Sequence, residues 1–283
     1  MLLDLPFDGS PVADYLERFY DGALRGRLPV GARFVLQRCG GCGLLYQRYA
    51  PGEELLAHLY GTAAVAGDDV ADRRGLDVRL AYAGQVITAL RWLRAAPGDT
   101  PVLDFGAGLG LWLDMAAALG CPTTGSELGA GLLGRISDHG HRAVALDDLP
   151  DAAYGLVNVE QVVEHLVRPA EVLDRLARAV RPGGLLRVAV PDGTGVADRL
   201  DRLRWDAPKD VPDSPNPVAP LEHLNCLDGP ALAALGRRVG LRPVVPPWRA
   251  VVWRGGRLRE VADTARARMR PGRGVQWFLR ETR

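Results

Sequence analysis

A glycine-rich turn in the middle of the chain has the residue types and spacing of a ligand-binding loop. It follows an apolar, strand-like segment and leads directly into a helical pattern. The residues of interest in it are Asp104, Gly106, Ala107, Gly108 and Gly110. Glycine lets the backbone approach a ligand without a Cβ clash, and the start of the next helix offers unpaired N–H groups. We therefore expect a bound ligand here, the alternative being a tight turn with a purely structural role.

The glycine spacing favours one class of ligand over another. A dinucleotide fingerprint, G-x-G-x-x-G, that starts at Gly106 would place its last glycine at position 111. That position is Leu111, and the glycine comes one residue earlier, at Gly110. Asp104 would also repel a pyrophosphate, whereas it suits a ligand with an ammonium group. S-adenosylmethionine carries an ammonium and a sulfonium group, so we expect this cofactor rather than NAD.

Acidic residues follow the next expected strands and complete the predicted cofactor site. Glu127 comes 21 residues after Gly106, where a carboxylate can accept the two hydroxyl groups of a ribose. Asp147 and Asp148 follow the third strand and could receive the adenine amino group, although such a turn is also common on protein surfaces. Glu160, at the end of the fourth strand, joins the predicted cofactor-binding set.

Two Glu-His pairs are the candidates for acid–base chemistry. Glu164-His165 follows the fourth expected strand, and Glu222-His223 follows a long segment rich in Asp, Pro and Arg. An imidazole titrates near neutrality and can take a proton from an acceptor. We predict His223 and His165 as catalytic residues, with His223 the better candidate for the base. The alternative is that both pairs only hold loops by hydrogen bonds.

Cys39-x-x-Cys42 has the spacing of a zinc knuckle, in which a tight turn points two thiolates at one metal. A structural zinc needs four ligands, yet Cys121 and Cys226 lie far away in the sequence. We therefore expect a metal-free remnant with less than one zinc per chain, and we predict no metal ligands.

Alternating strands and helices predict the fold that holds these residues. The expected strands are 101–105, 122–127, 142–146, 155–160 and 184–190, and the expected helices are 78–95, 109–119, 130–138, 170–180 and 229–239. Apolar runs near 241–253 are expected to supply the last strands. This order predicts an α/β domain with a doubly wound, mostly parallel, seven-stranded sheet.

The remaining segments predict the domain organisation. Residues 1–77 form a small N-terminal α+β module, with helices at 11–24 and 52–60 and two strands within 33–49. Residues 78–283 form the main domain, in which 192–228 is an insertion on the substrate side. The segment 254–283 holds nine Arg against three acidic residues. Such a run is usually a solvated face, although it could attract an anionic acceptor.

The overall charge excludes several kinds of partner. The chain has 35 basic and 34 acidic residues, which gives a formal charge of +1. Its net charge therefore creates no electrostatic field that would attract nucleic acid or an anionic membrane. No apolar run approaches the length of a membrane span, and the start of the chain lacks a signal peptide pattern. We therefore expect a cytoplasmic protein with a small-molecule acceptor. The sequence does not decide between a monomer and a homodimer.

With these motifs assembled, the chain resembles the class I S-adenosylmethionine-dependent methyltransferases. Within that family it is similar to the bacterial group of ubiquinone O-methyltransferase relatives and the methyltransferases of sugar and natural-product pathways. The segments that carry the resemblance are 102–110, Glu127, 159–169, 181–184, 190–192 and 222–225. The resemblance implies methyl transfer to an O or N atom of a small molecule, with S-adenosylhomocysteine as the product.

The resemblance also has consequences for metals and for nucleic acid. Many members carry an N-terminal zinc module with two Cys-x-x-Cys knuckles, of which this chain retains only one. Some quinone O-methyltransferase relatives hold a metal with Glu-x-x-Glu-His, but Gln161 occupies the first of those positions here. We therefore expect no catalytic divalent ion. Members that methylate DNA bases often have Asn/Asp-Pro-Pro-aromatic after the fourth strand, which this chain lacks.

Two other function classes stay open at this point. The first is a protein that binds S-adenosylmethionine without methylating, or that uses the same fold as a cyclase. The second is a nicotinamide oxidoreductase, which the glycine spacing disfavours.

Overall fold

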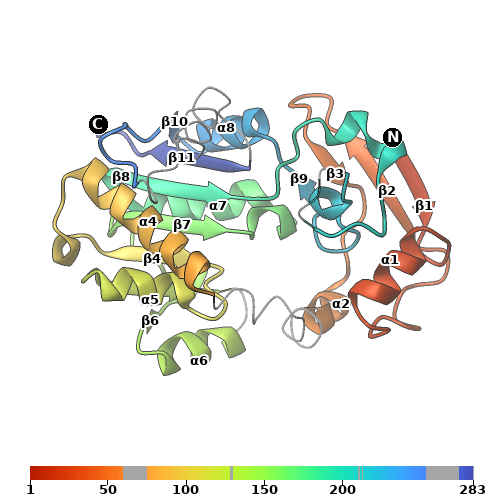
Figure 1. Cartoon of the computed structure of the whole chain (residues 1–283), viewed down its shortest axis with the longest axis horizontal. Coiled ribbons are helices and arrows are strands. Elements are labelled where there is room, and N and C mark those ends of the chain that lie inside the picture. The colour runs from red at the N-terminus through yellow and green to blue at the C-terminus, as the bar shows by residue number, and fades with distance from the viewer. Residues whose placement is uncertain (60–74, 128–129, 210, 212, 253–273, 283) are drawn as a thin grey trace.

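The structure, a computed structural model, consists of two β-sheets with their helices, which lie side by side in Figure 1. It describes residues 1–59, 75–127, 130–209, 211, 213–252 and 274–282. One sheet has seven strands and the other has four.

The seven-stranded sheet forms the main domain. Its strands are β4 (Val102–Phe105), β5 (Thr123–Ser126), β6 (Arg142–Ala143), β7 (Tyr154–Glu160), β8 (Val180–Ala189), β10 (Arg242–Val244) and β11 (Val275–Leu279). Their spatial order is β10-β11-β8-β7-β4-β5-β6. Strands β6, β5, β4, β7 and β8 pair in parallel, whereas β11 is antiparallel to both of its neighbours. The predicted doubly wound, mostly parallel sheet is confirmed.

Helices cover both faces of this sheet, because the strands between them are apolar on both faces. The helices are α4 (Leu76–Leu93), α5 (Leu111–Ala118), α6 (Ala130–Asp138), α7 (Pro169–Ala179) and α8 (Gly229–Arg238). Buried residues of α4, α5 and α6 share one core with Val102 and Leu185. Buried residues of α7 and α8 share the other core with Leu103 and Val157.

The last strand differs from the prediction. Strand β10 does come from the apolar runs near 241–253, but the strand beside it, β11, comes from the segment 254–283 that the sequence marks as basic. Trp277 and Phe278 of β11 are buried, so apolar packing inserts this strand between β8 and β10. The end of the chain is therefore part of the sheet. Most of the predicted arginine run, residues 254–273, lies outside the described residues.

The four-stranded sheet draws on two distant parts of the chain. It contains β1 (Leu3–Pro6), β2 (Arg33–Arg38) and β3 (Leu45–Gln47), followed by β9 (Asn225–Cys226). Two helices, α1 (Val12–Phe19) and α2 (Glu53–His58), accompany it. The sequence prediction missed β1, and it did not foresee that β9 joins this sheet.

The insertion 192–228 packs into the N-terminal module. It contains the short turns η5 (Val196–Asp198), η6 (Leu200–Arg202) and η7 (Asn216–Val218). Val196, Val218 and Leu221 share a buried core with Phe34 and other residues of the N-terminal module. Figure 1 shows β7 and β8 pointing toward this module, so it faces the carboxyl ends of the parallel strands.

In the part of the chain that the structure describes, no helix has both the length and the apolar character that crossing a bilayer requires.

Two helical glycines allow a test of the packing between α8 and β11. A Cβ on Gly236 would overlap the ring of Phe278, whereas a Cβ on the exposed Gly134 of α6 would meet nothing within 4 Å. We expect Gly236→Ala to lower the free energy of unfolding by about 1–3 kcal/mol, because the core must open to take the methyl group. Gly134→Ala should raise it by about 0.5–1 kcal/mol. Chemical denaturation measures both, and equal stabilities for the two variants would contradict this packing.

Candidate active site

The glycine loop, residues 106–110, connects β4 to α5 at the carboxyl edge of the sheet. Gly106, Gly108 and Gly110 have φ values of +77°, +53° and +74°, a left-handed conformation that other residues adopt only with strain. A Cβ on Gly106 would collide with the side chain of Val162, which follows β7. A Cβ on Gly108 would meet nothing within 4 Å. Gly106 is therefore needed for packing, whereas Gly108 borders open space.

Glu127 meets this loop from the neighbouring strand. The backbone N–H of Gly108 donates a hydrogen bond of 2.7 Å to Oε1 of Glu127, which follows β5. This contact joins the carboxylate predicted for a ribose to the glycine predicted for close ligand approach. A loop N–H and a half-buried carboxylate thus lie side by side at the edge of the sheet.

A row of polar side chains crosses the sheet behind the loop. Asp104, Asn158 and Arg187 are neighbours in register on β4, β7 and β8. The Asn158 amide donates to Oδ1 of Asp104 at 2.8 Å, and the Arg187 guanidinium donates to Oδ1 of Asn158, also at 2.8 Å. All three residues are buried, so each depends on the next for its hydrogen bonds.

Glu160 connects this row to the helices. Its Oε2 accepts hydrogen bonds from Arg187 at 2.8 Å and from the amide of Gln85 at 3.4 Å. Oε1 of Gln85 in turn accepts from the indole N–H of Trp112 at 2.9 Å. The carboxylate is therefore fixed from two sides at the end of β7.

Sequence reasoning missed Asn158, Arg187 and Gln85. The detectable signal is a polar residue in the middle of a strand that is otherwise apolar, as at Asn158 in β7 and Arg187 in β8. A fully buried position of that kind needs a partner. Two such positions on neighbouring strands therefore indicate a pair.

Burial changes the acidity of Asp104. Loss of hydration raises the pKa of this carboxyl to about 8, and the charges of Glu160 and Glu127 add to the rise, while the Asn158 hydrogen bond opposes it. Asp104 is only 4% exposed. It therefore lies behind the loop, bonded to Asn158, instead of presenting its carboxylate to solvent.

The other predicted residues of the cofactor site lie on or near the same edge. Ala107 is buried within the loop. Asp147 and Asp148 are exposed on the turn η3 (Leu146–Asp148), which follows the edge strand β6. Strand β5 separates β6 from β4, so these two carboxylates lie farther along the edge than Glu127. Their role toward the adenine stays a prediction.

The two Glu-His pairs, which are 58 residues apart in the sequence, come together in the structure. Glu164 and His165 lie on the turn η4 (Val163–His165) directly after β7, and His223 lies just before β9. The rings of His165 and His223 are edge to face, with centroids 4.8 Å apart. We call Glu164, His165 and His223 the histidine cluster.

Backbone carbonyls orient both imidazoles. Nδ1 of His165 donates to the carbonyl of Glu222 at 3.0 Å, and Nδ1 of His223 donates to the carbonyl of Asn216. Since a carbonyl can only accept, both rings carry their proton on Nδ1. In the neutral form of each ring, Nε2 is then an acceptor.

Glu164 is the least satisfied charged group of the site. It is 1% exposed, and neither carboxylate oxygen has a hydrogen-bond partner among the described residues. Nε2 of His165 lies 3.8 Å from its Oε1. Burial raises the pKa of Glu164 to about 8 and, with a contribution from the neighbouring His165, lowers the pKa of His223 to about 3.

The histidine cluster has the donor set of a metal site. One oxygen or nitrogen atom of each side chain lies within 4.8 Å of the corresponding atoms of the other two. A buried carboxylate without hydrogen bonds and two imidazoles with acceptor Nε2 atoms are groups that a divalent cation would satisfy. The residues present therefore fit a cation. Gln161, by contrast, is exposed at the end of β7.

The cysteine pair lies in another part of the molecule. Cys39 and Cys42 flank the turn between β2 and β3, and both thiols are reduced, as are the buried Cys121 and Cys226. Hydrogen bonds with Cys42 and with the backbone of Gly41 lower the pKa of Cys39. The prediction that this pair is a remnant without zinc stays a prediction.

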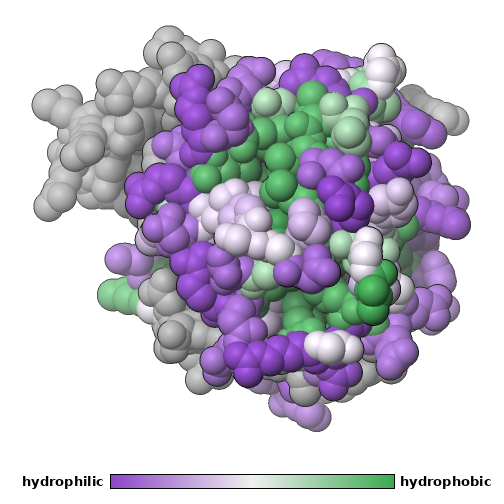
Figure 2. Space-filling view, turned by 90° about the vertical axis from the view of Figure 1, so that its right-hand side faces the viewer, coloured by the Kyte–Doolittle hydropathy of each residue, from purple (hydrophilic) through white to green (hydrophobic). Residues whose placement is uncertain are grey.

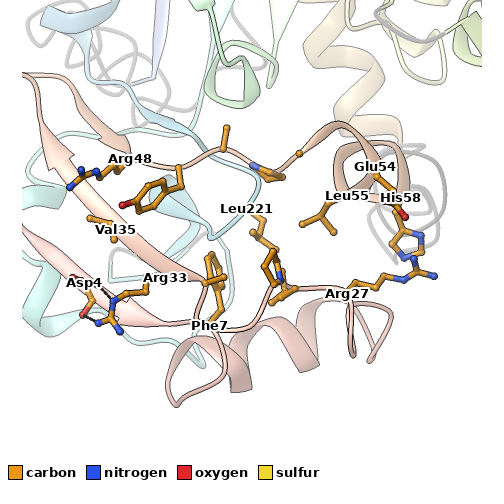
Figure 3. A pocket seen from close by; sticks show the side chains of 18 of the residues that line it. Asp4, Phe7, Arg27, Arg33, Val35, Arg48, Glu54, Leu55, His58 and Leu221 are labelled. Atoms are coloured by element: carbon orange, nitrogen blue, oxygen red, sulfur yellow. Dashed lines mark hydrogen bonds and ion pairs between the residues drawn. The ribbon is translucent and has the colours of Figure 1, made fainter.

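A cavity of about 730 Å³ opens within the N-terminal module (Figure 3). Its wall combines apolar side chains such as Phe7 and Val35 with Arg27 and Arg48. Leu221 lines it one residue before the second Glu-His pair. The residues known to line it include none from the glycine loop or the histidine cluster. Figure 2 shows hydrophobic surface on this side of the molecule, bordered by hydrophilic side chains.

The family match covers most of the segment that forms the seven-stranded sheet and its helices. A family described as "Methyltransferase domain" matches residues 77–245. The ubiquinone biosynthesis O-methyltransferase of Rhizobium leguminosarum bv. trifolii (strain WSM2304) is 33% identical over 120 residues, which cover 37% of this chain and 48% of that protein. The corresponding protein of Rhizobium rhizogenes is 32% identical over the same coverage. The chain thus spans about half the length of the curated relatives it matches.

Solved structures share the fold at low sequence identity. The 1,6-didemethyltoxoflavin-N1-methyltransferase of Burkholderia thailandensis, solved with 1,6-didemethyltoxoflavin and S-adenosylhomocysteine, has a TM-score of 0.51 and 16% identity, covering 87% of this chain and 99% of that one. The plantazolicin methyltransferase BamL, solved with a triazolic desmethylPZN analogue and S-adenosylhomocysteine, has a TM-score of 0.51 and 11% identity, covering 81% of this chain and 95% of that one.

The raised pKa of Asp104 leads to a test by pH. Between pH 6.5 and 8 the folded protein keeps the Asp104 proton and the unfolded chain has lost it, so stability falls as pH rises through this range. Glu164 acts in the same direction. Each group contributes a slope of up to about 1.4 kcal/mol per pH unit. We expect Asp104→Asn to remove one of the two contributions while it keeps the hydrogen bond from Asn158.

Denaturation curves at several pH values between 6.5 and 8 measure this slope for the wild type, Asp104→Asn and Glu164→Gln. An unchanged slope in a folded Asp104→Asn protein would show that Asp104 is ionised in the folded state.

Proposed function

The chain belongs to the methyltransferase family whose domain spans residues 77–245, and from that premise we propose that it transfers the methyl group of S-adenosylmethionine to an oxygen or nitrogen atom of a small molecule. S-adenosylhomocysteine is the second product. A sugar or natural-product intermediate is the acceptor class that we propose from the sequence resemblance.

The observation that carries this proposal is the contact between the glycine loop and Glu127. Gly108 borders open space, and Oε1 of Glu127 lies 2.7 Å from the Gly108 nitrogen. An adenosyl amino acid needs both features, because its ribose hydroxyls donate to a carboxylate and its amino-acid end lies against the loop backbone.

The charges near the loop suit a cationic cofactor. Asp104, Glu127 and Glu160 contribute acidic groups, and the buried Arg187 balances part of their charge through Asn158 and Glu160. A bound ammonium or sulfonium group would favour the ionised form of Asp104, since an opposite charge nearby lowers the pKa of a carboxyl. We propose that the carboxylates of Asp104, Glu127 and Glu160 attract the cationic donor. Asn158 and Arg187, behind them, hold Asp104 and Glu160 in position.

The chemistry we propose is an in-line displacement. An acceptor lone pair attacks the methyl carbon, the carbon–sulfur bond breaks, and the sulfur keeps the electron pair. Such a transfer depends mainly on alignment and on exclusion of water, so the largest contribution of the chain is to hold the two reactants in line. The acceptor loses its proton during or after the transfer.

The histidine cluster is our candidate for the acceptor side. It lies after β7, and Val162 beside it packs against Gly106 of the glycine loop. His165 is half-buried and His223 is buried, and both present Nε2 as the accepting atom. His223 as the acceptor's proton partner remains part of the proposal, although an imidazole whose pKa is about 3 is a weak base at neutral pH.

A turnover assay separates this proposal from a protein that binds S-adenosylmethionine without methylating. Release of S-adenosylhomocysteine that depends on an added acceptor would support methyl transfer. Cofactor binding without any such release, across candidate acceptors, would support the binding or cyclase class. Tighter binding of NAD than of S-adenosylmethionine would favour the oxidoreductase class.

Gly108 provides the sharpest test of the cofactor site. Gly108→Val should be strained by the left-handed φ of +53° but should still fold, because no atom lies within 4 Å of the new Cβ. We expect it to weaken S-adenosylhomocysteine binding by at least about 100-fold, since the side chain would occupy the ligand's place. Gly240→Val is the matched control, because Gly240 has a similar φ of +76° and equal space but follows α8. Calorimetry measures both affinities. Equal affinities in two folded variants would refute the assignment.

The histidines can be tested by separating turnover from cofactor affinity. We expect His223→Ala to lower kcat by about 10²–10⁴-fold while the Kd for S-adenosylhomocysteine stays within a few-fold of the wild type, because a proton partner acts only on transfer. His165→Ala should weaken cofactor binding and turnover together, because His165 follows β7 and fixes the geometry beside the cofactor site. Kinetics with an identified acceptor and calorimetry with the product measure the two quantities. If His223→Ala keeps its rate and its pH profile, alignment alone accounts for catalysis.

A further inference from the structure

The two Glu-His pairs converge on one point from two separate segments of the chain. Glu164 and His165 come from the turn after β7, and His223 comes from the end of the insertion 192–228. We infer that Glu164, His165 and His223 bind one divalent cation, with His223 as the ligand that completes the site. The argument rests on the positions of these three side chains and on the contacts that hold them.

The first observation is the Glu164 carboxylate. Both of its oxygens are buried, and no other described residue donates a hydrogen bond to them, so that only the backbone N–H of Glu164 itself opposes the rise in its pKa. Native proteins rarely leave a buried carboxyl group in this state, because a polar group removed from water without a hydrogen bond is costly. Nε2 of His165 lies 3.8 Å from Oε1 of Glu164, too far for a hydrogen bond, and a metal ion between the carboxylate and the two imidazoles would supply the missing partner.

The second observation is the orientation of the imidazoles. Each ring donates its Nδ1 proton to a backbone carbonyl, His165 to Glu222 and His223 to Asn216. Histidines that bind metals in proteins are oriented in this way, since the outer hydrogen bond fixes the tautomer and leaves the other nitrogen to coordinate. The potential ligand atoms of the cluster all lie within 4.8 Å of one another.

Further contacts hold the two segments at this distance. The side-chain amide of Asn225 donates to the carbonyl of Leu166 at 2.7 Å, directly after His165. The amide of Gln47, from β3, donates to the carbonyl of His223 at 3.0 Å. The ligands therefore belong to backbone that is fixed on both sides, as a preformed site requires.

The donor set indicates which cation would bind. Two imidazole nitrogens and one carboxylate suit zinc, manganese, iron, cobalt or nickel, whereas magnesium and calcium prefer oxygen ligands alone. Ligand atoms about 2.1 Å from a metal lie about 3–4 Å apart, so binding would draw the three side chains slightly together.

The sequence alone argues against a metal, because Gln161 replaces the first glutamate of the Glu-x-x-Glu-His pattern. The structure nevertheless favours a metal here, because Gln161 is exposed and His223, 58 residues after His165, has a ligand atom within 4.8 Å of the Glu164 carboxylate. Three protein ligands also leave a coordination position open, as in catalytic sites. If the proposed methyl transfer is right, that position would face an acceptor oxygen, and the ion would take the place of His223 in favouring loss of the acceptor's proton, because an Nε2 that binds the ion cannot also accept a proton.

Metal binding can be measured without any turnover. Chelator-treated protein is titrated with Co(II) and with Zn(II) by calorimetry, and the Co(II) complex is followed by visible absorption. We expect one ion per chain, an absorption spectrum without a thiolate charge-transfer band, and a rise in Tm on metal addition. Glu164→Gln and His223→Asn should raise the Kd at least about 100-fold.

The cysteine pair supplies the matched control. The double variant Cys39→Ser, Cys42→Ser should keep the ion and its spectrum, because those thiols lie in another part of the molecule. No stoichiometric binding of either ion by the folded wild-type protein would overturn the inference. So would a thiolate band in the wild type together with loss of the ion in the cysteine variant. Because these readouts are independent of an acceptor, the inference can fail while methyl transfer stands.

Discussion

One side chain, Asn225, holds together the two halves of this molecule at the site. Its backbone belongs to β9, which pairs with β3 in the N-terminal sheet, while its amide donates to the carbonyl of Leu166 in the main domain. The same stretch of chain carries Glu222 and His223, so the contact brings the second Glu-His pair against the first. Together with the hydrogen bond from His165 to the carbonyl of Glu222, it fixes the insertion 192–228 relative to the end of β7. The geometry of the histidine cluster therefore depends on a sheet that is built from residues nearly 180 positions apart.

Buried polar groups recur throughout the site, and they are satisfied to different degrees. The row of Asp104, Asn158 and Arg187 is connected by short hydrogen bonds across three neighbouring strands. These hydrogen bonds hold the three side chains in place, and Arg187 and Gln85 hold Glu160 by donating hydrogen bonds to its carboxylate. Glu164 lies on the same edge but has no such connection among the described residues. Because a buried carboxylate without a partner is unstable relative to one in water, this contrast marks Glu164 as the place where a ligand is needed.

The glycine loop shows how one motif serves packing and binding with different residues. Gly106 cannot carry a side chain because Val162 fills the space above it, whereas Gly108 faces open space. The contact with Val162 also places the turn that carries Glu164 and His165 beside the loop. The donor and acceptor sides of the proposed reaction thus lie next to each other in the structure, as alignment of two reactants requires.

The sequence by itself determined the main fold and the edge at which the site lies. Apolar strands that alternate with amphipathic helices are local patterns, and the glycine loop and Glu127 follow strands that such patterns predict. The sequence could not predict that Val275–Leu279 enters the sheet or that β9 pairs with β3, because strand pairing between distant segments depends on tertiary packing. Nor could it predict that His223 meets Glu164 and His165. That contact exists only because the insertion folds against the N-terminal module, and no spacing along the chain records it.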